Sequence, residues 1–258
     1  MGILNRDGYN IFYKWYGKKN GQVIILSHSL GANMEMWKPQ LAEFSKHFRI
    51  LLYDHPGHGK SSKRLKSGEI SDYGQDVLAL MDTLGINKPF FCGLSLGGMV
   101  GIWLGAMAGN RFKKIVICNT AAKIENTEIL NSRISIIKEQ GIGAIAHDVI
   151  KKWFTKEYIK SEIEIIKRIK KIFLTTSREG YIQASETVCR LDLYEELDQI
   201  DIPVLVVYGI NDLATPPKWN EFIIEKVKHS VKLKLGTGHL SNIEAADEFN
   251  KGVIKFLS

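Results

Sequence analysis

A single serine lies in a glycine-flanked motif that suits nucleophilic chemistry. Residues 90–98 read Phe-Phe-Cys-Gly-Leu-Ser-Leu-Gly-Gly, so Ser95 is the centre of a Gly-x-Ser-x-Gly motif between an apolar run and a helical pattern. A sharp strand-to-helix turn at such a position exposes the serine hydroxyl. We therefore expect Ser95 to act as a nucleophile, the alternative being an idle serine at a glycine-rich helix start.

A serine hydroxyl attacks carbonyl groups only when a base takes its proton and a carboxylate orients that base. Asp212 follows the apolar run 204–208, and His239 follows the run 231–235 in a glycine-rich loop. The chain order Ser, Asp, His is the one that a parallel sheet with this serine turn requires. The sequence predicts a triad of Ser95, Asp212 and His239, although Asp212 could instead only begin a turn and cap the next helix.

Two backbone N–H groups are expected to stabilise the charge that develops on the attacked carbonyl oxygen. One belongs to Leu96, directly after the nucleophile, and the other to Leu30 in the loop after the strand-like run 23–26. His28 precedes Leu30, and we interpret it as a brace of this loop. The segment 54–61, which contains His55 and His58, is interpreted as a structural turn.

Short apolar runs alternate with helical patterns along most of the chain, at residues 23–26, 48–53, 90–92, 115–118 and 204–208. Continuous apolar strands that alternate with helices indicate a mostly parallel sheet covered by helices on both faces. Residues 10–16 alternate and predict an antiparallel edge strand. Residues 123–192 show only helical patterning, so we expect a helical cap there, inserted into a core of residues 1–122 and 193–258.

A lysine-rich stretch over residues 151–171 contributes much of the net charge of +7. Isoleucines recur in it at helical spacing, at Ile159, Ile163, Ile166 and Ile169. We expect the lysines, Lys152 among them, to form the solvated face of one amphipathic helix. Nucleic-acid binding is the alternative, and a positive field that attracts small anions is compatible with a solvated face.

Other features narrow the expected partners. The three cysteines are far apart and lack a Cys-x-x-Cys pair, so they signal neither a disulfide framework nor a zinc site. No apolar run suits a signal peptide or approaches the roughly 18 residues of a membrane span. We expect a cytoplasmic protein with a small-molecule substrate, no metal, no cofactor, no nucleic acid and no membrane partner. Whether the chain forms a homo-oligomer stays open.

With these residues placed, the chain resembles the 3-oxoadipate enol-lactonases along nearly its whole length. The likeness is carried by residues 27–31 with Trp37, 93–101, 118–121, 152–154 and 239–244. The resemblance implies an α/β-hydrolase fold, with a mostly parallel eight-stranded sheet flanked by helices and a helical cap inserted after the sixth strand. It also implies hydrolysis of a small anionic enol-lactone to 3-oxoadipate in aromatic-compound catabolism, without a cofactor.

The same resemblance suggests how substrate is held under the cap. Arg133 lies where the family carries an arginine that meets the substrate carboxylate, and Trp153 is a candidate wall of the pocket. Arg133 could instead be a surface residue, and Trp153 a buried aromatic of the cap. The chain departs from the family at His28, where the lactonases often have Asn, and at His55-Pro56, which replaces Arg-Gly. The first departure concerns substrate preference more than catalysis.

Two other functions remain open on the sequence. A fold and a triad do not specify a substrate, so another small-ester or carbon–carbon bond hydrolase is the first alternative. The second is a ligand-binding receptor that keeps the hydrolase fold and turns over little substrate. Rapid hydrolysis of an activated ester would favour an enzyme over the receptor.

Overall fold

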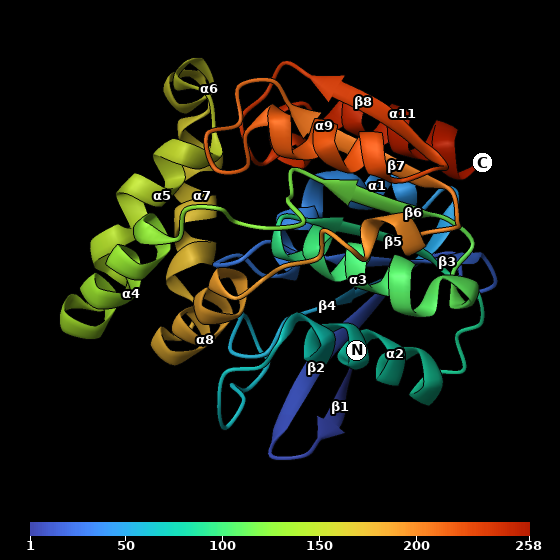
Figure 1. Ribbon diagram of the computed structural model, residues 1–258, viewed down its shortest axis with the longest axis horizontal. Helices are drawn as coiled ribbons and strands as arrows, with labels where there is room; N and C mark the ends of the chain where they lie inside the picture. Colours follow the sequence, from blue (N-terminus) through green and yellow to red (C-terminus); the bar gives the residue numbers. More distant parts are fainter.

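A single eight-stranded sheet forms the centre of the computed structural model, which describes residues 1–258. Its strands lie in the order β1-β2-β4-β3-β5-β6-β7-β8 (Figure 1). They are β1 (Gly2–Arg6), β2 (Tyr9–Gly17), β3 (Gln22–Ser27), β4 (Phe48–Tyr53), β5 (Phe90–Leu94), β6 (Ile115–Cys118), β7 (Val204–Gly209) and β8 (Ser230–Leu235). Strand β2 is antiparallel to both of its neighbours, and every other neighbouring pair is parallel. The predicted fold class is confirmed.

Helices cover both faces of the sheet. The core helices are α1 (Lys38–Phe44), α2 (Ile70–Thr83), α3 (Leu96–Ala108), α9 (Pro217–Lys226), α10 (Ser241–Glu244) and α11 (Ala246–Leu257). Alternate strand residues enter two separate cores: Phe91 packs with α2, α3 and α9, whereas Cys92 packs with α1 and α11. None of the helices combines the length and the apolar composition needed to cross a membrane.

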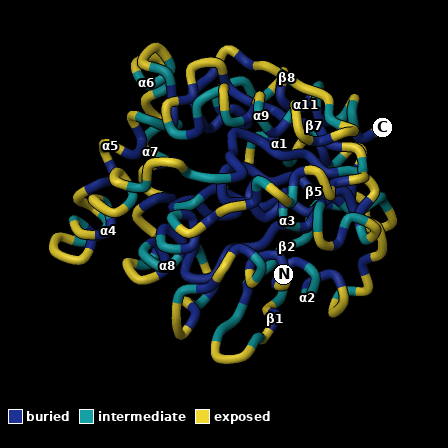
Figure 2. Tube along the Cα trace, in the orientation of Figure 1, coloured by how far each residue is buried: buried dark blue, intermediate teal, exposed yellow.

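The central strands read as continuous apolar runs because neither face of the sheet meets water. All residues of β5, β6 and β7 are buried, whereas β8 at the edge has only Leu235 buried. Figure 2 shows this contrast as a dark centre with exposed segments on the outer helices and loops. The parallel strands therefore form a rigid base from which the loops at their carboxyl ends project.

The N-terminal hairpin differs from the expectation. The segment predicted as an edge strand is β2, which is antiparallel as expected but lies between β1 and β4. Strand β1 occupies the edge and joins β2 through a turn at Gly8, whose φ is +82°. The prediction was wrong about the edge because β1 buries only Leu4 and so carries no alternating pattern.

The helical cap lies between β6 and β7. Its helices are α4 (Glu128–Gln140), α5 (Ala146–Trp153), α6 (Lys156–Ser161), α7 (Ile163–Leu174) and α8 (Arg178–Cys189). In Figure 1 they stand at one end of the molecule, and the arrowheads of β6 and β8 point toward them. The chain enters and leaves this insertion side by side, because Lys123 pairs with Asp192 in an isolated bridge. We propose this pairing as the base of the cap.

The lysine-rich stretch is not one amphipathic helix. It forms α5, α6 and α7, with breaks at Phe154 and at Glu162, whose backbone leaves the helical region. The prediction relied on isoleucine spacing, but Ile163 is 55% exposed and so does not share a buried face with Ile169. Lys152 belongs to the separate helix α5, which changes its expected role.

Candidate active site

Ser95 stands at the turn between β5 and α3 in a backbone conformation that side chains rarely adopt. Its φ is 59° and its ψ is −113°, and strain of this kind is characteristic of functional turns. Two residues before and two residues after Ser95, only glycine fits. A Cβ on Gly93 would lie 2.0 Å from the Gly97 carbonyl oxygen, and a Cβ on Gly97 would lie 2.3 Å from the Ser27 carbonyl oxygen. The turn therefore holds Ser95 at the end of a buried strand with its side chain toward a cavity.

His239 and Asp212 meet above the carboxyl ends of β7 and β8. The His239 Nδ1 lies 2.8 Å from Asp212 Oδ2, and both side chains are almost fully buried. Because the carboxylate can only accept, Nδ1 carries the hydrogen, and Nε2 of the neutral ring is free to accept from a hydroxyl group. The pair has the arrangement that a general base and its orienting acid require.

The Asp212 carboxylate receives a dense set of donors. Its Oδ1 accepts the N–H groups of Ala214 and Thr215, and its Oδ2 accepts the Thr215 hydroxyl at 2.7 Å and the Asn119 amide at 3.0 Å. Burial raises the pKa of Asp212, but His239, Asn119 and Thr215 together lower it below its ordinary value. Asp212 thus also begins a turn, so the structural role considered for it coexists with the contact to His239.

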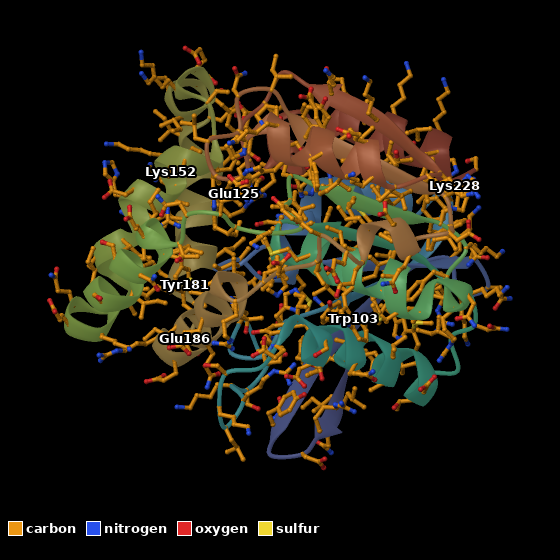
Figure 3. The ribbon with its side chains drawn as sticks, in the orientation of Figure 1. Trp103, Glu125, Lys152, Tyr181, Glu186 and Lys228 are labelled. Atoms are coloured by element: carbon orange, nitrogen blue, oxygen red, sulfur yellow. The ribbon has the colours of Figure 1, made fainter.

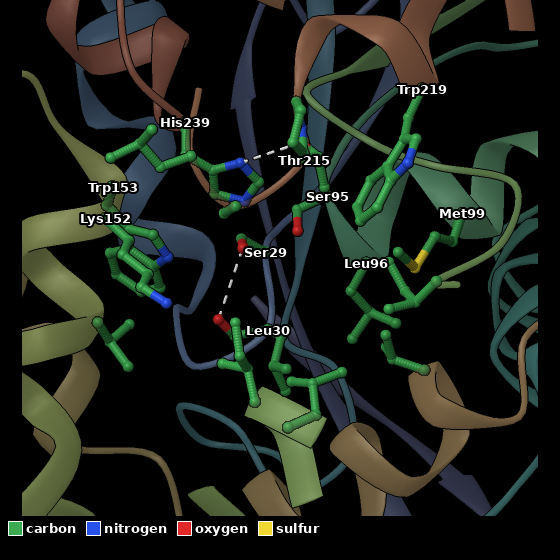
Figure 4. A pocket seen from close by; sticks show the side chains of 18 of the residues that line it. Ser29, Leu30, Ser95, Leu96, Met99, Lys152, Trp153, Thr215, Trp219 and His239 are labelled. Atoms are coloured by element: carbon green, nitrogen blue, oxygen red, sulfur yellow. Dashed lines mark hydrogen bonds between the residues drawn. The ribbon is translucent and has the colours of Figure 1, made fainter. Parts of the chain in front are cut away.

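Ser95 and His239 line one cavity of about 400 Å³. In Figure 4 the His239 ring lies next to the Ser95 side chain. No hydrogen bond joins Ser95 Oγ to His239 or to any other group of the protein. Catalytic hydrogen bonds of this type are often long before substrate enters and tighten in the complex.

The two residues predicted to supply amide donors line the same cavity. Leu30 and Leu96 both line it, and the Leu30 N–H has no acceptor in the protein. Leu96 is the first residue of α3, where no preceding helical turn can accept its N–H. The Gly97 N–H donates to the His28 carbonyl at 3.2 Å, which ties the loop of Leu30 to the turn of Ser95.

The remaining histidines lie outside this arrangement. His28, His55 and His58 are buried beneath the loop of Leu30 and do not line the cavity. His229 lies before β8, and its Nε2 is 3.3 Å from Asp201 Oδ1. Its neighbour Lys228 lies at the opposite end of the molecule from the cap in Figure 3.

Several known proteins are similar to this chain in sequence or in fold. A family model described as alpha/beta hydrolase fold matches residues 22–144. The 3-oxoadipate enol-lactonase 2 of Acinetobacter baylyi is 36% identical over 241 residues, which cover 93% of this chain and 90% of that protein. The 3-oxoadipate enol-lactonase 1 of the same organism is 31% identical, with 96% and 92% covered.

The crystal structure of the enol-lactonase from Burkholderia xenovorans LB400 superposes with a TM-score of 0.96. It is 38% identical to this chain and covers 99% of both chains. The chain belongs to the enol-lactonase family of α/β hydrolases. Membership of this family makes it a hydrolase of carboxylic esters, and the resemblance that the sequence showed to 3-oxoadipate enol-lactonases is confirmed.

The cap of this enol-lactonase homologue lines one side of the cavity, and the two cap residues predicted from the sequence are part of that lining. Arg133 of α4 and Trp153 of α5 line it, and Trp153 is only 4% exposed, packing edge-on against Phe173 with ring centroids 5.8 Å apart. Figure 4 shows Lys152 and Trp153 on one side of the cavity and Met99 and Trp219 on the other. The structure thus brings both predicted cap residues to the cavity that Ser95 enters.

Lys152 lines the cavity, although the sequence did not suggest this position for it. It was expected on a solvated face, but it lines the cavity, and burial together with the nearby Arg133 lowers the pKa of its amine. The error arose because Lys152 was grouped with lysines of α6 and α7, which are exposed. Its position directly before a buried tryptophan was the available signal.

Asn119 was also missed as a contributor to the site. It follows β6 with φ +45° and is fully buried between Asp212 and Ser241, whose hydroxyl donates to its Oδ1 at 2.5 Å. A buried asparagine in the left-handed region directly after a parallel strand was the signal that could have identified it.

Proposed function

We propose that the chain is a serine hydrolase that opens a small anionic enol-lactone, with 3-oxoadipate enol-lactone as substrate and 3-oxoadipate as product. One observation carries the proposal: two cations without a carboxylate partner, Arg133 and Lys152, line the cavity that also holds Ser95 and His239. A third lining cation, Lys218, lies 3.9 Å from the carboxylate of Glu125, which lines the same cavity. A substrate that has an ester bond and a carboxylate would place the ester at Ser95 and His239 and the carboxylate at Arg133 and Lys152.

The proposed reaction uses Ser95 and His239, which line one cavity, and Asp212, which lies 2.8 Å from His239. His239 Nε2 takes the proton of Ser95 as its Oγ bonds to the lactone carbonyl carbon, and Asp212 stabilises the imidazolium that forms. In this mechanism the N–H groups of Leu30 and Leu96 stabilise the charge on the carbonyl oxygen. Loss of one such donor typically costs about 3 kcal/mol of transition-state stabilisation.

Ring opening breaks the bond between the carbonyl carbon and the ring oxygen, and the leaving enolate takes the proton from the His239 imidazolium, which returns His239 to the neutral form, and tautomerises to the ketone. Because an enolate is a good leaving group, the step needs no metal-bound water. His239 then removes a proton from water, which attacks the acyl-serine and releases the second carboxylate. The net reaction adds one water to the lactone.

The two cations account for substrate choice. In 3-oxoadipate enol-lactone one carboxyl group is closed in the ring and the other is free, so a single anion has to be held. A guanidinium can bind that carboxylate through two parallel hydrogen bonds, and an ammonium adds a point charge. Burial and the nearby Arg133 disfavour the charged form of Lys152. An anion that binds between the two side chains would offset this effect and would itself be stabilised by both positive charges.

The experiment compares two lactones that differ only in this charge. α-Angelica lactone has a methyl group where the proposed substrate has a carboxymethyl group, so it offers the same ring without the anion. We expect kcat/KM to be about 10- to 100-fold higher for the anionic lactone. This ratio corresponds to the free energy that one hydrogen bond to a charged group contributes. Ser95→Ala should abolish turnover of both.

Each outcome separates the parts of the proposal. A Ser95→Ala protein that still opens either lactone would exclude the serine mechanism. Equal rates on both lactones, or a preference for the neutral one, would exclude the anionic substrate but leave the hydrolase. Slow single-turnover labelling of Ser95 without release of product would support the receptor instead.

A further inference from the structure

Three histidines that the proposed reaction does not use form a cluster beneath the loop of Leu30. His28, His55 and His58 are each no more than 1% exposed. The ring of His28 lies 4.4 Å from that of His55 and 5.3 Å from that of His58, centroid to centroid. Three basic rings so close together are costly to bury unless they stay uncharged.

Hydrogen bonds to the backbone define the state of two of these rings. The Gly31 N–H donates to His58 Nε2 at 3.1 Å, and the His58 Nδ1 lies 3.0 Å from the Pro56 carbonyl oxygen. A ring nitrogen that accepts an N–H carries no hydrogen, and one that faces a carbonyl must donate. His58 is therefore bonded as the neutral tautomer with its hydrogen on Nδ1.

His28 is bonded in the same way. Its Nε2 accepts the His55 N–H at 2.8 Å, and its Nδ1 donates to the Ser29 carbonyl oxygen at 2.8 Å. His55 itself donates from Nε2 to the His28 carbonyl at 3.2 Å. Burial lowers the pKa of His58 to about 4, and it lowers the pKa values of His28 and His55 well below their ordinary range.

These contacts fall on the two peptide groups that flank Leu30. The Ser29 carbonyl and the Leu30 N–H belong to one planar trans peptide and point in opposite directions, so holding the oxygen aims the hydrogen. His28 donates to that oxygen at 2.8 Å and the Ala32 N–H donates to it at 3.1 Å, while His58 accepts the N–H of the following peptide at Gly31, whose φ is +74°. The free Leu30 N–H is thus oriented from both sides.

We propose that His28 and His58, as uncharged tautomers, orient the Ser29–Leu30 peptide so that its N–H faces the reacting carbonyl oxygen beside Ser95. They are positioning residues, because neither lines the cavity. The inference rests on the proposed serine mechanism, in which Leu30 supplies one of the two donors. A small displacement of such a donor can reduce the rate by about 100-fold.

Matched substitutions separate this role from simple packing. The amide of glutamine reaches the place of a histidine Nε2, whereas the amide of asparagine reaches only that of Nδ1. We expect His58→Gln to retain an acceptor for the Gly31 N–H and to stay within about threefold of the wild-type kcat, since that hydrogen bond survives. We expect His58→Asn to lose about 10- to 100-fold in kcat, because the acceptor is gone and the donor shifts.

The pattern reverses at position 28, where Nδ1 makes the contact that orients the peptide. His28→Asn should keep kcat and lose stability, because it retains a donor for the Ser29 oxygen but no acceptor for the His55 N–H. His28→Leu should lose both. Hydrolysis of p-nitrophenyl acetate reports on kcat even if the lactone is not the substrate, and inhibition by adipate reports on ground-state binding, which we expect to be unchanged in all four variants.

A measurement on the wild-type protein tests the inference without any variant. Nitrogen-15 NMR of histidine-labelled protein at pH 7 should show His28 and His58 as neutral rings with the hydrogen on Nδ1. A hydrogen on Nε2, or a charged ring, would overturn the inference, and so would equal kcat values for the Gln and Asn variants at position 58. Loss of all esterase activity is expected only for Ser95→Ala, which tests the mechanism itself.

Discussion

Asn119 donates from its side-chain amide to Asp212 Oδ2 at 3.0 Å, the same oxygen that faces His239. The residue holds a left-handed backbone to make this contact, and its own oxygen accepts from Ser241. The amide therefore links the loop after β6 to the loops after β7 and β8. It also contributes to the lowered pKa of Asp212, which favours the ionised carboxylate.

Replacing this amide by a carboxylate should impair the site without changing its shape. In Asn119→Asp, two buried carboxylates lie side by side, so the pKa of one of them must rise. We expect kcat/KM at pH 7 to fall at least tenfold, because His239 loses part of the negative charge that stabilises its protonated form. We also expect the acid limb of the pH–rate profile to move to higher pH, because the carboxyl group with the raised pKa ionises only there. Asn131→Asp, which adds the same charge at an exposed position of α4, should leave the profile unchanged.

Lys152 should govern the binding of the anion and not the chemistry. We expect Lys152→Met to raise KM for 3-oxoadipate enol-lactone about 10-fold, the lower end of what a hydrogen bond to a charged group contributes, with kcat little changed. The KM for α-angelica lactone should stay the same, because that lactone has no carboxylate. Lys151→Met, at the exposed neighbour in α5, is the control, and an equal effect of the two substitutions would contradict the assignment.

Glu244 joins the cap to the loop of His239. Its carboxylate accepts the Gly238 N–H at 2.9 Å and the Thr155 N–H at 3.2 Å, and it also bonds to the Thr155 hydroxyl. In Glu244→Gln the side-chain NH₂ cannot accept these donors, so we expect a loss of about 1.5–3 kcal/mol in the free energy of unfolding and a lower kcat. Urea unfolding and steady-state kinetics measure both. The exposed Glu248→Gln serves as the control, and the same response in both variants would argue against this link.

The histidine cluster should make the fold sensitive to acid. The pKa values of its three rings lie below the ordinary value near 6.5. As the pH falls below that value, the unfolded chain therefore binds more protons than the folded chain. Stability that depends on the neutral rings is complete above about pH 6.5 and declines toward pH 4, by up to about 1.4 kcal/mol per pH unit for each ring. His58, with its pKa of about 4, sets the lower end of this range.

Charged neighbours modify this acid response in opposite ways. Burial raises the pKa of Asp54 to about 6, so its protonation favours the folded chain between pH 6 and 4 and opposes the histidines. Arg64 disfavours protonation of His55 and acts with the cluster. Urea unfolding at pH 7.5, 6 and 4.5 should show a net decline, with a shallower slope in His58→Gln. A flat or rising curve for the wild-type chain would show that the rings are not buried uncharged.

Local patterns in the sequence predict where the residues of the candidate site lie along the chain. The nucleophile turn is recognisable because its glycines, its strand and its helix are consecutive, so the interactions that shape it lie within nine residues. Asp212 and His239 were found because each follows an apolar run at the carboxyl end of a strand, and parallel strands bring such ends to one edge. The helical cap was predicted for a related reason, since a long stretch without strands has to leave the sheet.

Contacts between distant segments were beyond these patterns. Strand β1 could not be recognised, because its partner and not its own composition makes it a strand. Lys152 looks like its lysine neighbours along the chain and differs from them only through the fold, which turns α5 toward the cavity. His58 likewise reads as part of a turn, and only packing against Gly31, 27 residues away, reveals its hydrogen bond to the loop of Leu30.

The sequence by itself determined the order of the central strands and the helices between them, the strained serine turn and the loops that carry Asp212 and His239, since these follow from side chains close together in the chain. The tertiary structure decided which polar groups are buried together, and therefore which atoms stay uncharged, which amide is left free and which cations meet in the cavity. Burial strengthens every hydrogen bond and penalises every unpaired charge, and a residue's burial depends on segments far away in the sequence.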